Sequence, residues 1–500
     1  MEIKIKETTA SSYAVLARIV KKAPIHMESV VPDVNDDIGR IFSVQPSVLL
    51  KSKEVTSRGV SVTGEVSVVL FYVNETENAV SNLTLAQSFS LDYEAADLDP
   101  ETLAQIRLFI GSTEARALNP RKVSAAVEIG GELTGYCKEE IRVSIAAPAE
   151  DELPIQTRSD SAECTLVNAV CEKTFVLNEH FPFPLSKPQP EHLAAHKVDL
   201  RIADKQLIGS KVLLKGSLCV EAYYLTSSAG YPVLESFSAP FSQLMDIAEE
   251  QMDNCTVIIE ATSCYFDLAD TIGGEKVLNA EIHAVAQLVS RKQQTLQYLS
   301  DAYCITMPCS IDYAPWHIQS AQTPIRLTLE VEDRLDLPED CTDVLAVFPC
   351  LSQSSVGPDK AESSVILDVL YRSAGGTLSS LRRTLRAEKA MSEPDASLIE
   401  ARILDSYFRP ETNQMSCHIS VELCCDICRE YEIRSAEALS LEEDAPYDLS
   451  ALPTVTAVRA DSESVWELAK TYHSSVRRIE EFNDIEGALQ GQLLLIPRGL

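Results

Sequence analysis

Apolar and polar residues alternate along most of the first 440 residues, which is the pattern of strands that bury one face. The clearest alternating positions are Val60, Val62, Val66, Val68, Leu70 and Tyr72, then Val123, Ala125, Val127 and Ile129, and then Ile419, Val421, Leu423 and Cys425. Gly64 interrupts the first of these runs and predicts a bulge or a bend. Many short strands with turns between them predict a mainly β fold built of sandwich-like units.

An internal repeat organises this β region. At a constant offset of 152, residues 60–64 align with residues 212–216. The same offset relates two aromatic pairs, Tyr72 with Tyr224 and Phe89 with Phe241. A third copy is more diverged: residues 365–371 repeat the strand that ends in tyrosine, and Ser363 takes the glycine position. The fold is therefore predicted to contain three tandem β-sandwich-like repeats.

Local signals predict the limits of these units. The predicted ranges are 1–155, 156–312 and 313–445 for the three repeats, 446–453 for a linker and 454–500 for a final small domain. A short helix is predicted over residues 99–106, with Asp99 as N-cap and Pro100 at the first helical position, and at the related segments 249–254 and 393–399. Stretches rich in acidic residues, Pro and Ser are predicted to connect the units, at residues 150–163, 309–319 and 441–453.

The hydrophobic period changes near the C-terminus. Val465, Leu468, Ala469 and Tyr472 recur at helical spacing, and so do Val476, Ile479 and Phe482. Ser464 and Glu467 form a capping-box pattern at the start of the first helix, and Ser474 or Ser475 is expected to cap the second. A short strand around Val455 and Val458 precedes the helices, and residues 493–497 form a closing strand. The order is βααβ.

Composition narrows the classes of function. The formal net charge of −32 argues against nucleic-acid and anionic-membrane partners, whose phosphates would repel the chain. The N-terminal residues lack the apolar run of a secretory signal, so a cytosolic location is expected. The fourteen cysteines are then expected to be free thiols, mostly small core residues.

No catalytic motif stands out. Residues 273–276, Gly-Gly-Glu-Lys, lack the spacing of a phosphate-binding loop and predict a tight turn. His192 and His196 have helical spacing but lack the glutamate of a metalloprotease, and the prolines before them favour a surface turn. Residues 417–428 contain four cysteines and one histidine. Alternation places Cys417 and Cys425 on the apolar face as core residues, while metal binding stays an alternative that stoichiometric zinc would establish.

The C-terminal pattern resembles a LysM domain, from the capped first helix to the closing Ile496-Pro497. The resemblance implies a βααβ module that binds N-acetylglucosamine chains in a groove between two loops. The residues that match this groove are Ser462, Glu463, Ser464, Val465, Trp466, Asn483, Asp484, Ile485, Glu486 and Gly487. The chain departs from the family at Ser462, where glycine is usual, and its groove region is acidic, which leaves a protein ligand open. Trp466 is expected to contact the ligand or to be a core residue.

The repeats resemble the SPOCS domain, through a Val-Pro or Phe-Pro pair, an apolar strand with a central glycine, and a strand that ends in tyrosine. Three such domains before one LysM domain are similar to the SipL-type family of spore coat morphogenetic proteins. The resemblance implies a mother-cell protein at the forespore surface and spore coat, whose tail engages a SpoIVA-like coat basement-layer ATPase and other coat proteins.

The sequence therefore predicts a non-enzymatic structural scaffold in endospore coat assembly, with no cofactor, metal or catalytic residue. The alternative is a protein that binds peptidoglycan or lipid-linked glycan precursors and uses its repeats as spacers. An enzyme anchored by a LysM domain is a third and weaker hypothesis, because no catalytic motif supports it. The β body and the acidic charge favour docking to a protein.

Overall fold

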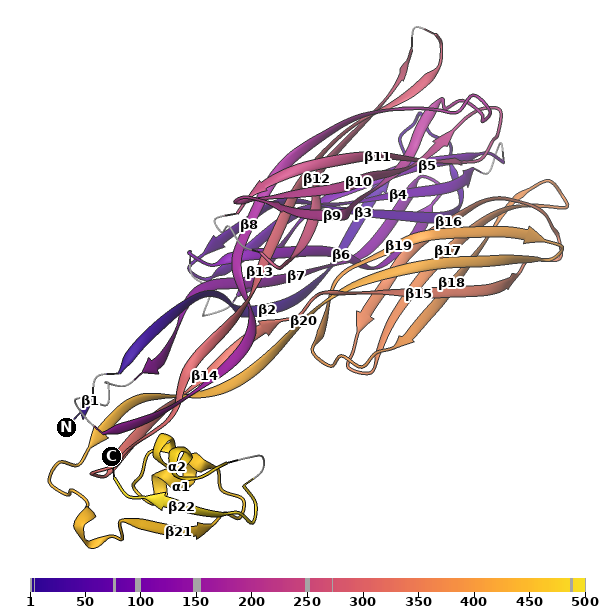
Figure 1. The fold of residues 1–500 in the computed structure, drawn as a ribbon. Coiled ribbons are helices and arrows are strands. Elements are labelled where there is room, and N and C mark those ends of the chain that lie inside the picture. Colours follow the sequence, from indigo (N-terminus) through magenta and orange to yellow (C-terminus); the bar gives the residue numbers. More distant parts are fainter. Residues whose placement is uncertain are drawn as a thin grey trace.

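The computed structural model describes residues 2–3, 5–74, 78–94, 100–146, 154–247, 252–271, 273–485 and 489–499 (Figure 1). Strands make up 77% of the chain, in antiparallel sheets that recur in groups and end in a small βααβ unit. The predicted fold class is confirmed.

The first group of strands, here called the first repeat, consists of β2–β7. Their bounds are β2 (Lys6–Val30), β3 (Ile38–Thr56), β4 (Gly59–Asn74), β5 (Val80–Glu94), β6 (Leu103–Asn119) and β7 (Lys122–Ala146). They form two three-stranded sheets, β3-β4-β5 and β2-β7-β6, in which β4 and β7 are the central strands. The inward residues of β4 and β7 meet in one core, as their alternation predicts.

The second repeat uses the same topology. Its strands are β8 (Ile155–Pro182), β9 (His192–Ile208), β10 (Lys211–Leu225), β11 (Val233–Asp246), β12 (Asn254–Asp270) and β13 (Lys276–Cys304). The sheets are β11-β10-β9 and β12-β13-β8, so β10 and β13 take the places of β4 and β7. A separate core fills the space between them.

The third repeat splits its first strand in two. Its strands are β14 (Cys309–Ala321), β15 (Ile325–Asp336), β16 (Cys341–Val356), β17 (Lys360–Ser373), β18 (Leu378–Ala390), β19 (Ala396–Glu411) and β20 (Gln414–Leu441). β14 and β15 pair in succession with the long strand β20, which β19 joins from the other side. β16-β17-β18 is the second sheet.

The glycine and the phenylalanine of the sequence repeat meet across neighbouring strands. Gly64 of β4 lies opposite Phe89 of β5, and Gly216 of β10 lies opposite Phe241 of β11. A Cβ atom at Gly64 would lie 2.3 Å from the Phe89 ring, so the ring needs the bare glycine. The register shifts beside Gly64, as the predicted bulge or bend at this residue requires, and also beside Gly216.

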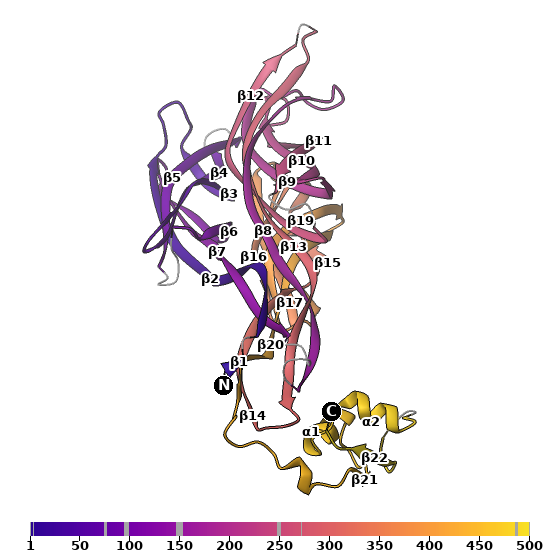
Figure 2. The same ribbon diagram turned by 60° about the vertical axis from the view of Figure 1, so that its left-hand side comes forward.

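The three repeats also share a central apolar cluster. Phe71 of β4 and Tyr223 of β10, which are 152 positions apart, both pack against Phe348 of β16, with ring centroids 5.2 and 5.1 Å away. Phe42 and Leu370 complete the contact. Because each repeat contributes to this cluster, the repeats form one closed body, as two views show (Figures 1 and 2).

A buried ion pair joins the second and third repeats. Both oxygens of Asp426 on β20 accept hydrogen bonds from the Nη2 atom of Arg291 on β13, at 2.9 and 2.8 Å. Arg291 is 1% exposed and donates a further bond from Nη1 to Thr256. Tyr136 of the first repeat is buried beside this pair, and burial raises its pKa to about 12.

The longest strands extend beyond the sandwiches and form a stalk (Figure 1). We define the stalk as residues 6–12 and 139–146 of the first repeat, 155–166 and 292–304 of the second, and 309–321 and 428–441 of the third, with β1 (Glu2–Ile3) paired to β20. Two small apolar clusters draw on different repeats and hold the ribbons together. The stalk thus ends in one narrow tip.

The short predicted helices are wrong. β6 begins at Leu103, and Ala104, Ile106 and Leu108 alternate into the core, because pairing with β7 outweighs the local helix signal. Residues 393–399 form a turn and the start of β19, and Asn254 starts β12. Asp99 and residues 249–251 lie outside the described residues.

Two further predictions need correction. Residues 155–163 and 309–319 are stalk strands and not connectors, because their exposed positions tolerate acidic residues, and edge strands such as β14 tolerate proline. Of the third predicted connector, Leu441 still belongs to β20, whereas residues 442–453 contain no strand and hold the 3-10 helix η1 (Leu449–Ala451). His192 and His196 lie on β9 and not in a turn. The His196 ring contacts Phe266, and burial lowers its pKa to about 4.

Other local predictions are confirmed. Gly274, with a φ of +78°, lies in the tight turn between β12 and β13. Cys417 and Cys425 pack in the core of the third repeat, where burial raises their pKa to about 11. All fourteen cysteines are free thiols.

Candidate functional site

The candidate site is the C-terminal βααβ unit, here called the tail unit. It consists of β21 (Val455–Arg459), α1 (Val465–Thr471), α2 (Val476–Phe482) and β22 (Leu493–Pro497), with β21 and β22 paired antiparallel. Its buried core residues are Ala460, Leu468, Ala469, Ile479, Leu494 and Ile496. The element order is the one that the sequence pattern predicts.

Local capping fixes both helices. Ser464 Oγ accepts a hydrogen bond from the Glu467 backbone N–H, and the Glu467 carboxylate accepts one from the Ser464 N–H at 2.7 Å. This predicted capping box is confirmed. It lowers the pKa of Glu467, because the Ser464 N–H favours the ionised carboxylate. Ser475 caps α2 by accepting from the Arg478 N–H.

Several predicted groove residues are engaged inside the unit itself. Glu463 accepts a hydrogen bond from the Asp461 N–H at 3.0 Å. The Asn483 side chain donates to the Ile479 and Leu495 carbonyls and accepts from the Leu495 N–H, each at 2.7 Å, so it ties the end of α2 to β22. These three side chains, Ser464 included, perform structural work that the groove interpretation did not predict.

The remaining predicted groove residues divide into core residues and exposed residues. Val465 and Ile485, from the two predicted groove loops, pack against the core of the tail unit. Ser462 and Asp484 are exposed. Glu486 and Gly487 lie outside the described residues. Both loops therefore reach one core.

Trp466 faces the stalk. Its indole Nε1 donates a hydrogen bond to Asp301 Oδ2 at 2.7 Å, and the Lys470 ammonium, one helical turn later, bonds both Asp301 oxygens at 2.9 and 3.0 Å. The Trp466 ring also meets the edge of Tyr303, with centroids 4.9 Å apart. Asp301 follows a register shift in β13, which is a common way for a strand to re-aim a side chain.

The electrostatics of this contact favour an ionised carboxylate. Burial alone would raise the pKa of Asp301, but hydrogen bonds from Lys470 and Trp466 outweigh it and hold the pKa below its ordinary value. The contact is therefore a charged clamp between the stalk tip and α1.

Further contacts fasten the tail unit. The buried Tyr303 hydroxyl donates to the Ser474 carbonyl at 2.7 Å, and Tyr303 and Ile305 belong to the same apolar cluster as the tail core. On the connector, the Tyr447 ring lies 4.1 Å from the His473 ring. The sequence predicted none of these contacts, because no local pattern marks a partner so distant in the chain.

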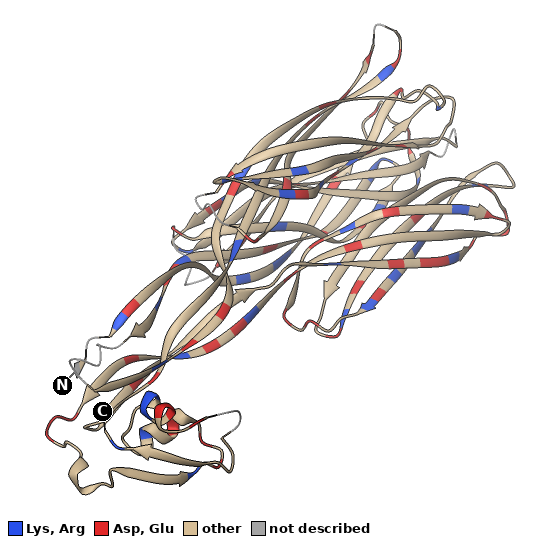
Figure 3. Cartoon of the chain, viewed as in Figure 1, with Lys and Arg blue, Asp and Glu red and all other residues tan. Residues whose placement is uncertain are grey.

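The outer face of the tail strands is mostly apolar and exposed, and Arg459, opposite Leu493, is its charged residue. Leu493, Leu495 and Val455 lie on the outer face of the two strands and are 63%, 42% and 41% exposed, and Phe482 at the end of α2 is 53% exposed. Figure 3 shows both acidic and basic residues on the helices of the unit and mostly uncharged residues along its strands. We call Val455, Phe482, Leu493 and Leu495 the outer patch.

Within the described ranges, no group of three or more His, Cys, Asp or Glu side chains is placed to hold a metal ion. No helix in the described part of the chain is long and apolar enough to cross a membrane.

Comparisons with known proteins add no family: no family model matches the chain, and no curated protein and no solved structure matches it.

Proposed function

We propose that the protein is a non-enzymatic scaffold in endospore coat assembly, and that its tail unit docks to a coat basement-layer ATPase. The resemblances to SPOCS and LysM domains supply this class of function. The observation that carries the proposal is the outer patch, because four large apolar side chains exposed on one small unit are typical of a protein-contact surface.

The tail unit favours a protein ligand over a glycan. Ser464, Glu463 and Asn483 already bond within the unit, and the Trp466 indole is held by Asp301. These are the side chains that a sugar would need for hydrogen bonds and ring stacking. The outer patch remains open, and its apolar character suits a protein surface.

The body of three repeats suits a scaffold. Its shared central cluster and its buried ion pair join the repeats into one unit, and the stalk carries the tail unit at one end (Figure 2). A body of this kind holds the tail at a set distance from the outer surfaces of the repeats. Each repeat adds a similar surface, which permits several weak contacts in a layered assembly.

A pull-down of the full-length protein against the coat ATPase tests the proposal. The double variant Leu493→Asp, Leu495→Asp is expected to lose binding at least tenfold, because it places two charges in the outer patch. Leu185→Asp is the matched control, since Leu185 is 72% exposed on the body of the protein. Sedimentation with peptidoglycan runs in parallel. Strong wall binding without ATPase binding would establish the glycan-binding alternative instead.

Microscopy of a fluorescent fusion during sporulation is the second test. The scaffold is expected to surround the forespore from the mother-cell side, and the double variant is expected to stay diffuse. A wild-type fusion that never reaches the forespore would contradict the proposal.

A further inference from the structure

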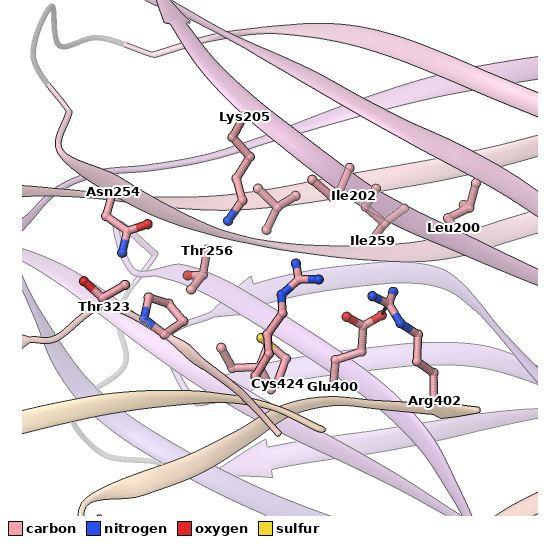
Figure 4. A pocket seen from close by; sticks show the side chains of 14 residues that line it. Leu200, Ile202, Lys205, Asn254, Thr256, Ile259, Thr323, Glu400, Arg402 and Cys424 are labelled. Atoms are coloured by element: carbon pink, nitrogen blue, oxygen red, sulfur yellow. Dashed lines mark hydrogen bonds and ion pairs between the residues drawn. The ribbon is translucent and has the colours of Figure 1, made fainter. Parts of the chain in front are cut away.

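A cavity of about 110 Å³ lies between the second and third repeats (Figure 4). β9 and β12 line it from the second repeat, and β15, β19 and β20 line it from the third. Its wall contains three basic side chains, Lys205, Arg326 and Arg402, and one acidic side chain, Glu400. Figure 4 shows Lys205 extending from its strand toward Thr256, with Glu400 and Arg402 farther along the facing wall. In a chain of net charge −32, this is a local excess of cations.

Lys205 has a counterpart in the first repeat. Lys53 lies opposite Val62 of β4, and Lys205 lies opposite Leu214 of β10, so the two lysines share one register position at the repeat offset of 152. Lys53 lies at the interface between the first and second repeats, here called the first interface. Lys205 lies at the interface between the second and third repeats, here called the second interface. The two interfaces can therefore be compared side chain by side chain.

At the first interface, the protein supplies its own anion. The Lys53 ammonium donates to the Ala104 carbonyl and contacts Glu172 Oε2 of the second repeat at 2.7 Å. It also lies 3.3 Å from Gln287 Oε1. A carboxylate and an amide oxygen thus neutralise and solvate this lysine.

At the second interface, the carboxylate is replaced by a cation. Glu172 lies opposite Gln287 on the central strand β13, and Arg326 lies opposite Cys424 on the central strand β20. On the two central strands, the residues just before Gln287 and Cys424 both pack on the core of their own repeat. Arg326 is therefore the counterpart of Glu172, and Cys424 is the counterpart of Gln287. Both acceptors of the first interface are missing here.

The charges around the cavity do not balance. Glu422 contacts Arg326 at 3.6 Å and also Arg402, and Glu400 contacts Arg402 at 3.4 Å. Two carboxylates thus serve two arginines, while the Lys205 ammonium bonds the Cys255 carbonyl at 2.5 Å and has no carboxylate among its described contacts. The buried Nε atom of Arg402 also has no hydrogen-bond partner among the described contacts. One positive charge and one donor remain for a ligand.

We propose that this cavity binds a small oxyanion, of the phosphate or carboxylate class, in the place that Glu172 occupies at the first interface. The volume exceeds that of one water and suits a tetrahedral or planar oxyanion. Guanidinium and ammonium groups bind such anions by charge-assisted hydrogen bonds. The hydroxyls of Thr256 and Thr323 and the amide of Asn254, which also line the cavity, are available as neutral donors. The bound anion joins the second and third repeats.

Thermal unfolding of the full-length protein tests this site. Sodium phosphate, sodium acetate and sodium chloride are compared at matched ionic strength and at about pH 7. Phosphate at tenfold excess over its Kd is expected to raise Tm by about 1–3 °C relative to chloride. An equal rise in acetate assigns small oxyanions in general, and a rise in phosphate alone assigns phosphate.

Two variants and one control make the test specific. Arg326→Glu supplies the carboxylate that Glu172 provides between the first and second repeats, at the expense of the contact with Glu422, and is expected to lose the phosphate effect. Lys205→Met removes the unpaired cation and is also expected to lose the effect. Lys215→Met, on the exposed face of β10, is expected to keep it. The proposal is overturned if wild type shows no phosphate effect beyond chloride, or if both cavity variants keep the full effect.

Discussion

The indole of Trp466 donates a hydrogen bond to Asp301 at 2.7 Å, although the two residues are 165 positions apart in the chain. Trp466 belongs to the helix of the tail unit, and Asp301 belongs to the stalk tip of the second repeat. Trp466, which was predicted to contact a ligand or to be a core residue, joins the tail unit to the stalk. The orientation of the outer patch therefore depends in part on this carboxylate, together with the contacts of Tyr303.

Replacing Asp301 with Asn is expected to loosen the tail unit. The change removes the charge that Lys470 bonds, at a cost to docking of about 1–3 kcal/mol. The protein has two tryptophans, so a Trp316→Phe background isolates the emission of Trp466. The emission is expected to shift to the red, and protease cleavage in residues 442–453 is expected to rise.

Asp484→Asn is the matched control for this experiment, because Asp484 is an exposed carboxylate on the same unit. It is expected to leave emission and cleavage unchanged. Unaltered emission in the Asp301 variant would show that the clamp does not hold the tail.

Glu260 makes the interface between the first and second repeats sensitive to pH. Its carboxylate accepts a hydrogen bond from the Leu108 N–H at 2.9 Å, and burial raises its pKa to about 8. Because the folded pKa lies above the unfolded value, the protonated group stabilises the fold fully below about pH 4.5, and this stability is lost as pH rises toward 8. Glu260→Gln is therefore expected to gain stability relative to wild type over this window.

Urea unfolding at pH 5, 7 and 9 measures the effect. The variant's advantage is expected to be smallest at pH 5 and largest at pH 9. Glu275→Gln, at an exposed turn residue, serves as control and is expected to show no such trend. An advantage that stays constant with pH would mean that Glu260 is ionised in the folded protein throughout.

Local patterns account for what the sequence predicted correctly. The capping box, the alternation of β4 and β20 and the glycine of the repeat each act through neighbours in the chain or on an adjacent strand. Such interactions leave a periodic or spaced signature. The strands, the repeat and the βααβ order therefore follow from the sequence.

The missed features depend on distant partners. Asp301 and Tyr303 carry no motif, and only the folded stalk brings them to Trp466. The helix predicted from Asp99 and Pro100 is replaced by β6, because its alternating Ala104, Ile106 and Leu108 gain more from the core than from a short helix. The groove prediction treated polar side chains as free, whereas the small unit uses Asn483 to tie itself together.

Removing one partner of the buried pair Arg291–Asp426 is expected to lower the free energy of unfolding strongly, whereas replacing both partners with apolar residues is expected to lower it little. Asp426→Ala leaves the buried guanidinium without its partner, at a cost of about 3–5 kcal/mol. The double change Arg291→Met, Asp426→Leu is expected to recover most of this cost, because it removes both charges. Urea unfolding measures both. Glu393→Ala breaks an exposed pair with Arg429 and is expected to cost under about 1 kcal/mol.

Gly64 is expected to be irreplaceable even by alanine. Alanine would gain up to about 1 kcal/mol by restricting the unfolded chain. Its Cβ, however, would lie 2.3 Å from the Phe89 ring and 2.7 Å from the Leu49 carbonyl oxygen, and overpacking of this kind costs about 1–3 kcal/mol. The net effect on the free energy of unfolding is therefore a loss.

The diverged third repeat offers the control for this last change. Ser363 occupies the glycine position opposite Ala387, where no aromatic ring covers the strand. Ser363→Ala removes a buried hydroxyl that bonds Ser354 and is expected to cost about 0.5–1.5 kcal/mol, without the overpacking that Gly64→Ala brings. The double variant Gly64→Ala, Phe89→Leu is expected to lose less than the sum of its single changes, because a smaller side chain makes room for the new methyl group. Strict additivity in thermal unfolding would contradict the direct contact between glycine and ring.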